Sequence, residues 1–146
     1  LDLAKTKKVN IFLPSDVIVS NQFSNTGTKK VLNIQEIPLG WQGLDIGPDS
    51  IDKFKNVIQK SKTILWNGPM GVFEMSSFDK GTHAIAKAVA ESTRNGAFSL
   101  IGGGDSVAAI KKFNLQDQVS FISTGGGAML VGLEGKTLPG IKALSE

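Results

Sequence analysis

The sequence predicts an α/β fold with a parallel sheet and crossover helices. Over the last two thirds of the chain, apolar strand-like segments alternate with amphipathic helix-like segments, which is typical of strand–helix–strand units. Two of the strand-like segments run into triple glycines, at 102–104 and 125–127. With 146 residues, 40% of them hydrophobic, the chain is long enough for one core and fits a single domain.

Composition excludes several classes of protein. The absence of cysteine excludes disulfides and thiolate zinc sites. No apolar stretch reaches the roughly 18–20 residues that span a bilayer, and the first residues lack the apolar run of a signal peptide. The charges are scattered, many of them as lysine pairs without interleaved aromatic residues, which favours a solvated surface over a nucleic-acid groove. We therefore expect a cytoplasmic protein that binds neither nucleic acid nor membrane.

The first third of the chain predicts short extended segments separated by loops. An apolar run at 9–13 predicts a buried strand, and 17–19 continues as a second short extended piece. Polar residues at 22–30 indicate a loop, and the alternation at 31–37 predicts a half-buried edge strand. The glycine-dense stretch 40–50 is expected to be a loop.

A helix is expected to follow, with Asp49 as its N-cap and Asp52 in its first turn. Its apolar side chains recur at helical spacing and would share one face: Ile51, Phe54, Val57 and Ile58.

The rest of the chain predicts alternating strands and helices. A strand ends at Trp66 and is followed by a turn at 67–69. The later strands are expected at 98–101 and 119–123, and the helices at 81–92, 107–113 and 128–133.

The glycine-rich turns predict an anion site. In a parallel sheet the turns at 67–69, 102–104 and 125–127 would lie at one edge, the carboxyl ends of the strands, where open α/β sheets bind ligands. The last two lead into helices, whose N-termini offer free N–H groups and partial positive charge. Two such joints suit a polyphosphate or two separate anions. The alternative is that glycine only permits tight turns.

Three familiar motifs are absent. A dinucleotide fingerprint needs a third glycine where Val107 and Leu130 stand. The stretch 132–137 resembles the end of a P-loop, but its first glycine is missing and no strand precedes it. The sole histidine, His83, lies on a polar helix face, so we expect it to be solvated rather than catalytic.

Asp105 follows the first triple glycine, where its carboxylate would repel a phosphate unless a cation intervened. Mg²⁺ bridging the carboxylate and phosphate oxygens would resolve that conflict. An Asp at this place also makes a good helix cap, and both interpretations are open from the residues alone. Ser106 offers the same alternatives, a cap or a donor to phosphate.

Five blocks of the sequence carry a resemblance to a known family. They are LPSDVIVS (13–20), GWQGLDIGP (40–48), WNGPMGVFE (66–74), IGGGDS (101–106), and STGGGA with LEGKTLPG (123–140). In this order and spacing they resemble the phosphoglycerate kinase family over essentially the whole chain.

The resemblance implies that residues 1–146 form part of the C-terminal, nucleotide-binding lobe, with an incomplete doubly wound, Rossmann-like sheet. The family transfers a phosphoryl group between 1,3-bisphosphoglycerate and ADP in glycolysis, forming 3-phosphoglycerate and ATP, with Mg²⁺ as cofactor. A nucleotide- or phosphate-binding module without catalysis is the alternative. A nicotinamide oxidoreductase is disfavoured by the missing fingerprint.

The resemblance also maps the family's site onto this chain. The expected nucleotide-binding residues lie at strand ends and glycine turns: Gly43, Leu44, Asn67, Pro69, Val72, Glu74, Gly103, Gly104, Asp105 and Ser106. Gly43, Leu44 and Val72 would line the adenine pocket. Glu74 would hold the ribose hydroxyls, and Asp105 would hold Mg²⁺. The expected catalytic residues, whose amides would face the transferring phosphoryl group, are Gly125, Gly126 and Gly127.

Compared with the family, the sequence lacks the N-terminal lobe, which grips the phosphoglycerate, and the opening strands of its own lobe with a nucleotide-binding lysine. We expect the strand order 3-2-1-4-5-6, with 9–13 on one side of the missing strands and the later strands on the other. The parent enzyme is expected to be a monomer. This chain is expected to be inactive alone and to need another chain to complete its sheet.

Overall fold

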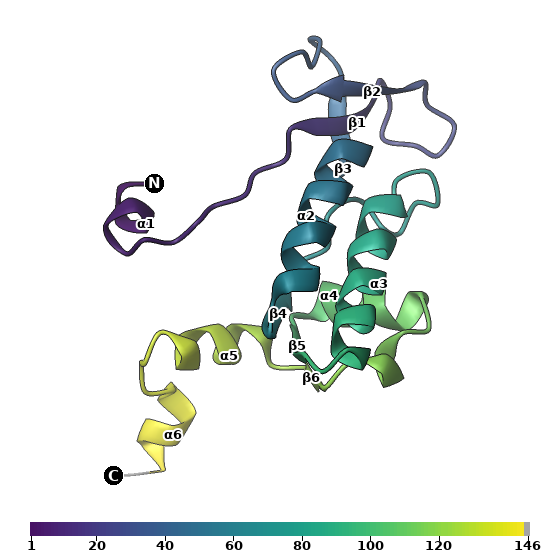
Figure 1. Ribbon diagram of the computed structural model, residues 1–146. Helices are drawn as coiled ribbons and strands as arrows, with labels where there is room; N and C mark the ends of the chain where they lie inside the picture. The colour runs from purple at the N-terminus through teal and green to yellow at the C-terminus, as the bar shows by residue number, and fades with distance from the viewer. Residues whose placement is uncertain (145–146) are drawn as a thin grey trace.

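The computed structural model describes residues 1–144, which form two three-stranded sheets connected by helices (Figure 1). In chain order the elements are α1 (Asp2–Thr6), β1 (Asp16–Ser20), β2 (Lys29–Asn33), β3 (Gln42–Ile46), α2 (Pro48–Lys60), β4 (Thr63–Asn67), α3 (Lys80–Arg94), β5 (Phe98–Gly102), α4 (Gly104–Lys112), the 3₁₀ turn η1 (Gln116–Gln118), β6 (Phe121–Ser123), α5 (Gly126–Leu133) and α6 (Pro139–Ala143).

The second sheet confirms the predicted α/β class. Its strands β4, β5 and β6 are parallel and lie side by side in chain order, with α3 and α4 as the crossovers. The register places Asn67 beside Gly102, and Gly102 beside Ser123. The carboxyl ends of all three strands therefore meet at one edge, as the glycine turns predicted.

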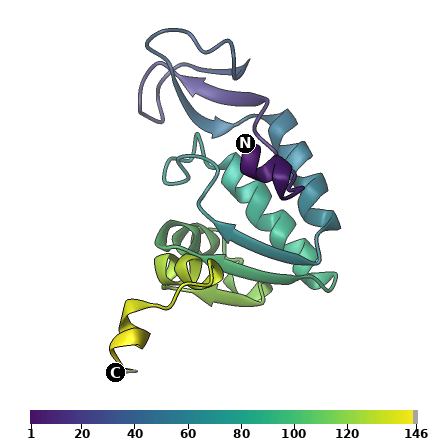
Figure 2. The same cartoon turned by 90° about the vertical axis from the view of Figure 1, so that its left-hand side faces the viewer.

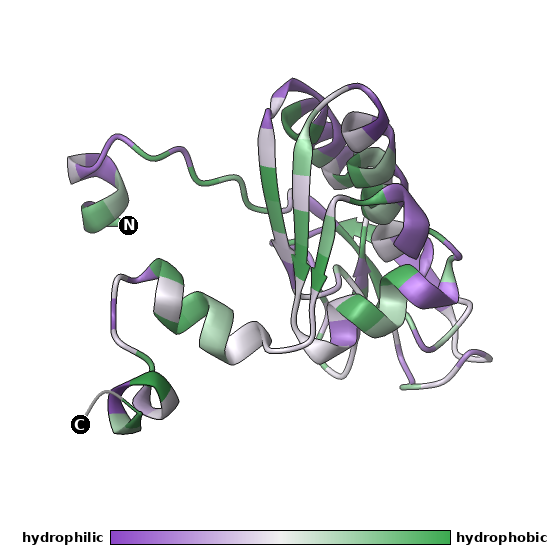
Figure 3. Ribbon diagram, turned by 90° about the horizontal axis from the view of Figure 1, so that it is seen from below, coloured by the Kyte–Doolittle hydropathy of each residue, from purple (hydrophilic) through white to green (hydrophobic). Residues whose placement is uncertain are grey.

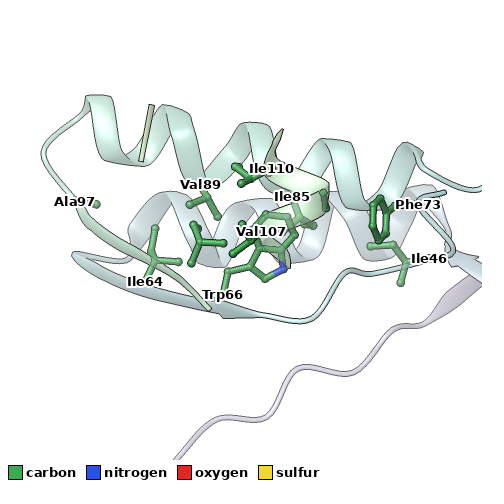
Figure 4. Close-up of a cluster of buried hydrophobic side chains, with 12 residues drawn as sticks. Ile46, Ile64, Trp66, Phe73, Ile85, Val89, Ala97, Val107 and Ile110 are labelled. Carbon is green, nitrogen blue, oxygen red and sulfur yellow. The ribbon is translucent and has the colours of Figure 1, made fainter. Parts of the chain in front are cut away.

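The hydrophobic core lies on one face of this parallel sheet. Ile64, Trp66 and Ile101 point from the strands toward apolar side chains of α2, α3 and α4, among them Ile85 and Ile110 (Figure 4). Helices α2, α3 and α4 lie on this side of the sheet, while both chain ends, with α1, α5 and α6, project from the other side (Figure 3). On that other face Leu65 of β4 is 41% exposed. Within residues 1–144, the parallel sheet is therefore covered on one face.

The first sheet is antiparallel, in the order β2-β1-β3, and differs in part from the sequence prediction. The predicted edge strand is present, but it spans 29–33 rather than 31–37. The loop predicted for 40–50 is wrong, because Gln42–Ile46 forms β3. Leu44 and Ile46 are buried there, so tertiary packing overrides the glycine-rich composition.

The strand predicted at 9–13 is also wrong. This segment has no regular structure, and Ile11, Phe12 and Leu13 are 50%, 44% and 60% exposed. An apolar run forms a stable strand only when a neighbour supplies hydrogen bonds, and no strand pairs with it within residues 1–144. The segment instead leads as an extended chain from α1 to β1 (Figure 1).

The cap predicted for α2 is wrong as well. The N-cap is Gly47, and Asp49 lies inside the first turn as an exposed residue. The carboxylate of Asp16, in β1, accepts hydrogen bonds from the Asp49 amide at 3.0 Å and the Ser50 amide at 2.8 Å. The Ser50 hydroxyl adds a third bond to it, of 2.6 Å. The free amides of this helix end are therefore satisfied by a strand more than thirty residues earlier.

Helix α3 begins in the same way. Its N-cap residue, Asp79, makes no side-chain capping bond. Asp45, in β3 and only 3% exposed, accepts a 2.7 Å hydrogen bond from the Gly81 amide. Two carboxylates of the antiparallel sheet thus cap the two longest helices, and this sheet lies above their N-terminal ends (Figure 2).

Replacing Asp16 by Ala is expected to lower the free energy of unfolding by about 1–3 kcal/mol at neutral pH, because the amides of Asp49 and Ser50 lose their acceptor. Burial raises the pKa of the Asp16 carboxyl, but the hydrogen bonds from Ser50 and Asp49 outweigh burial and leave the pKa below 3.8. The stabilisation that the Asp16 carboxylate provides is therefore present above pH 3.8 and is lost as the pH falls through its lower pKa in the folded state. Urea denaturation measures both effects. The control variant, Asp49→Ala, should lower the free energy of unfolding much less. An equal loss would mean that Asp49 caps the helix.

Asp45 should give the opposite pH dependence. Burial raises the pKa of Asp45 to about 6, the Asp79 carboxylate adds to this, and hydrogen bonds from the Gly81 and Ile46 amides oppose it. The stabilisation from its neutral form is complete below pH 3.8 and is lost as the pH rises through about 6. Between pH 7 and pH 5, the native chain should gain roughly 1 kcal/mol relative to Asp45→Asn. Parallel pH–stability curves for the two proteins would contradict this assignment.

Candidate functional site

A cavity of about 420 Å³ lies between β3 and the loop that follows β4. Its lining includes four of the residues predicted for the nucleotide: Gly43, Leu44, Pro69 and Val72. The volume falls within the usual range for small-molecule sites. The structure therefore brings together residues 43–46 and 69–72, which belong to two sequence blocks and have α2 and β4 between them along the chain.

The loop after β4 starts with a tight turn that is fixed from two sides. The buried Trp66 donates its indole N–H to the Gly68 carbonyl at 2.7 Å, and the Gly68 amide donates to the Ser106 hydroxyl at 2.6 Å. Gly68 has a φ of +116°, which favours glycine. Because Ser106 is fully buried at the start of α4, its hydroxyl ties this loop to the first triple-glycine joint.

The two triple-glycine joints pack directly against each other. A Cβ atom on Gly126 would overlap the Gly103 amide nitrogen and lie 2.5 Å from the Gly103 Cα. The Asn67 side-chain oxygen lies against Gly103 from the other side. The prediction that the glycine turns share one edge is thereby confirmed at the level of backbone contact, and α4 and α5 start side by side (Figure 2).

Other glycines in the joints leave their backbone accessible. A Cβ atom on Gly104 or Gly127 would meet no atom within 4 Å, and both residues are in the first turns of their helices. Gly125 is the N-cap of α5. This end of the sheet thus presents the N-termini of two helices, both at least eight residues long, beside open space.

Asp105 is exposed in the first turn of α4, and its carboxylate makes no hydrogen bond or ion pair within residues 1–144. The capping interpretation of Asp105 therefore has no bond to support it, since the N-cap of α4 is Gly103 and makes no side-chain cap. Within the same residues, no three Asp, Glu or His side chains form a group able to hold a metal ion. A cation at Asp105 would need ligands from a bound molecule or water.

Glu74 is exposed in the same loop, two residues beyond Val72 of the cavity lining. The carbonyl of its neighbour Phe73 accepts a hydrogen bond from Lys112, which also forms a 3.0 Å ion pair with Asp79. Lys112, at the end of α4, therefore holds the loop near the residue predicted to bind ribose. His83 is exposed, as expected, and stacks on Phe113 with the ring centroids 4.5 Å apart.

The sequence interpretation missed the residues that support the site. Asp45 and Gly71 line the cavity, and Thr82 and Lys112 hold the loop in place. The signal available in the sequence was an acid within a short apolar segment, LDI, at 44–46, but its partner amide is 36 residues away.

Comparison with known proteins decides the family. The phosphoglycerate kinase family model matches residues 1–136. The chain belongs to the phosphoglycerate kinase family. Phosphoglycerate kinase of Porphyromonas gingivalis is 56% identical over 97% of this chain, and the cytosolic phosphoglycerate kinase of Triticum aestivum is 53% identical over all of it.

Solved structures of the family agree with the fold. Phosphoglycerate kinase from Coxiella burnetii superposes with a TM-score of 0.88 at 46% identity over 97% of this chain. The enzyme from Pyrococcus horikoshii gives 0.78 at 35% identity over 99% of the chain. The chain spans about a third of these proteins, 36% and 35%, and 34–36% of the two curated relatives. None of the helices within residues 1–144 combines the length and apolar character needed to cross a bilayer.

The contact between the glycine joints yields a paired prediction. Gly126→Ala is expected to lower the free energy of unfolding by about 1–3 kcal/mol, because its Cβ would overlap the backbone of Gly103. Gly127→Ala, one residue further along the same helix, should be neutral or slightly stabilising. Thermal unfolding of both variants tests this. Equal stability of the two would mean that the joints do not pack this closely.

Proposed function

We propose that this chain supplies the Mg²⁺–nucleotide site of a phosphoglycerate kinase, the enzyme that transfers a phosphoryl group between 1,3-bisphosphoglycerate and ADP. The proposal rests on one arrangement. The loop after β4 lines a cavity of about 420 Å³, and its Gly68 amide is hydrogen-bonded to Ser106 at the start of α4. The start of α4 in turn contacts the start of α5. The cavity suits a nucleobase and the helix N-termini suit phosphates. Membership of the family supports the same assignment.

Each end of the site has a distinct role in this proposal. Leu44 and Val72 provide apolar walls for adenine, and Gly43 and Pro69 shape the cavity beside them. The exposed carboxylate of Glu74 accepts hydrogen bonds from the ribose hydroxyls.

The phosphate end is built from the glycine joints. Gly103, Gly104 and the α4 N-terminus bind the phosphates beside Asn67, and the buried Ser106 fixes the turn that joins them to the adenine end. Gly125, Gly126 and Gly127 present the start of α5 toward the transferring group. Of these three, Gly126 is buried and also serves packing, whereas Gly125 and Gly127 are exposed.

The unpaired carboxylate of Asp105 fits Mg²⁺, which prefers oxygen ligands from one or two carboxylates together with phosphates and water. When bound, the ion would neutralise charge on the phosphate oxygens during transfer. Asp105 itself contributes a negative group at the start of α4, where the helix favours it and where it keeps the ion beside the phosphates.

Catalysis further requires groups that grip the phosphoglycerate, which we assign to parts of the enzyme outside this chain. The 146-residue chain alone should therefore bind nucleotide without turnover. We also propose that further strands cover the apolar hollow beside β4, which Phe12, Phe54, Leu65 and Met70 help to line. They would come from the same polypeptide in a monomeric, cytoplasmic enzyme or, for the isolated chain, from another chain. The relative from Triticum aestivum is named as cytosolic.

The experiment compares this chain with the whole enzyme, meaning a full-length polypeptide of the family that contains the segment. ADP is titrated into each with and without Mg²⁺, and ATP formation from 1,3-bisphosphoglycerate is then measured. Binding to both, with turnover only by the whole enzyme, is expected. A whole enzyme that binds ADP but never forms ATP would favour a nucleotide-binding module. Turnover by the purified short chain would contradict its inactivity.

Asp105→Asn tests the metal assignment in the whole enzyme. The variant should lose most of the gain in ADP affinity that Mg²⁺ provides and should bind ADP without Mg²⁺ about as well as the parent, because only the cation needs the full negative charge. Asp49→Asn is the matched control, since Asp49 is also an exposed acid in the first turn of a helix. Calorimetry at several Mg²⁺ concentrations gives both affinities. Equal weakening with and without Mg²⁺ would remove Asp105 from the metal site.

A further inference from the structure

The wall of the cavity is held by a buried hydroxyl that no part of the proposed chemistry uses. Thr82, in the first turn of α3, is fully buried. Its hydroxyl oxygen accepts hydrogen bonds from the amides of Met70 at 3.1 Å and Gly71 at 3.2 Å. Met70 and Gly71 line the cavity, whereas Thr82 does not.

These two amides have no other acceptor within residues 1–144, so the hydroxyl is their link to the rest of the fold. The next amide along the loop, that of Val72, donates to the Leu44 carbonyl at 2.8 Å. Three consecutive amides of the loop are thus fixed, two by α3 and one by β3. The loop has no freedom to shift relative to Leu44 without breaking one of these bonds.

Asp45 occupies the space behind the same loop. A Cβ atom on Gly71 would lie 2.6 Å from its Cγ atom, and a Cβ on Gly81 would lie 2.9 Å from the same atom. The carboxylate is therefore enclosed between the loop and the start of α3, to which the Gly81 amide binds it. The position of Gly71 is determined by Asp45 on one side and by the Thr82 hydroxyl on the other.

We infer that Thr82 is a positioning residue for the nucleotide, whose hydroxyl holds the backbone of residues 70–71 so that the cavity keeps the width that the base requires. The inference rests on the proposed function, because it assigns the base to this cavity. Thr82 contacts no substrate itself. Its effect should fall on nucleotide affinity and leave the binding of the second substrate unchanged.

Valine has nearly the shape of threonine but lacks the hydroxyl, so Thr82→Val in the whole enzyme leaves the part-buried amides of Met70 and Gly71 without an acceptor. We expect the KM for ADP and the Kd for ADP to rise about tenfold, the KM for 1,3-bisphosphoglycerate to stay within about twofold, and kcat to fall less than the KM rises. Thr82→Ser keeps the hydroxyl and should restore most of the ADP affinity.

Thr93→Val is the matched control for stability. Thr93 lies on the same helix, away from the cavity; its hydroxyl donates to the Val89 carbonyl at 2.8 Å, and the Ser99 hydroxyl lies 2.7 Å from it. The Thr93→Val variant should have a lower melting temperature and unchanged KM values for both substrates. If the valine variant does not fold, Thr82→Ala replaces it, because alanine is less prone to steric strain. The KM for ADP should rise by the same factor in this variant.

The outcomes separate the two hypotheses. If the parent enzyme does not bind ADP, the proposed function fails. If the parent binds ADP and the Thr82→Val or Thr82→Ala variant binds it within twofold of the parent, the positioning role is wrong and the proposed function stands. An equal rise in the KM for both substrates, or a similar rise in Thr93→Val, would likewise show that Thr82 contributes only to general stability.

Discussion

The structure depends on the constraint that the first amides of a helix need acceptors. In α2 and α3 the N-cap side chains provide none, and the carboxylates of Asp16 and Asp45 do so from the antiparallel sheet. A carboxylate also complements the positive end of the helix. These bonds determine where the antiparallel sheet lies relative to the parallel one. Since β3 forms one wall of the cavity and the loop near α3 forms the other, they determine the cavity as well.

The same constraint explains glycines outside the two triple-glycine joints. Gly47 approaches the Asp16 carboxylate so closely that a Cβ would lie 2.8 Å from its Oδ1 atom, and Gly71 and Gly81 enclose Asp45 in the same manner. A carboxylate can accept amides from a helix end only where the backbone comes within hydrogen-bonding distance. Side chains at these positions would keep the strand and the helix apart. The high glycine content thus reflects the surroundings of two carboxylates inside the protein as well as the proposed anion site at its surface.

Predictions from the sequence were correct for features that depend on neighbouring residues. They were wrong where contacts between distant residues determine the structure. Alternation of strands and helices and the triple glycines at 102–104 and 125–127 were sufficient to predict the parallel sheet and the edge that its glycine turns share. Asp49 was a reasonable local cap, but Asp16, thirty-four residues before Ser50, takes that role. The run at 9–13 has the composition of a strand and no partner within residues 1–144. Thr82 could not be identified from sequence, because nothing local relates it to Met70 and Gly71.

The triple glycines turn out to combine two requirements that no single residue satisfies. Gly103 and Gly126 bring two backbones into contact, and Gly103 also has a φ of +87°, so both positions are needed for packing and chain direction. A Cβ atom on Gly104 or Gly127 would meet no atom within 4 Å, so these residues leave the helix starts open. Contact between the joints brings two helix N-termini to one place, and openness lets a charged group approach them. A joint with one glycine could pack or bind, whereas three consecutive glycines allow both on successive residues.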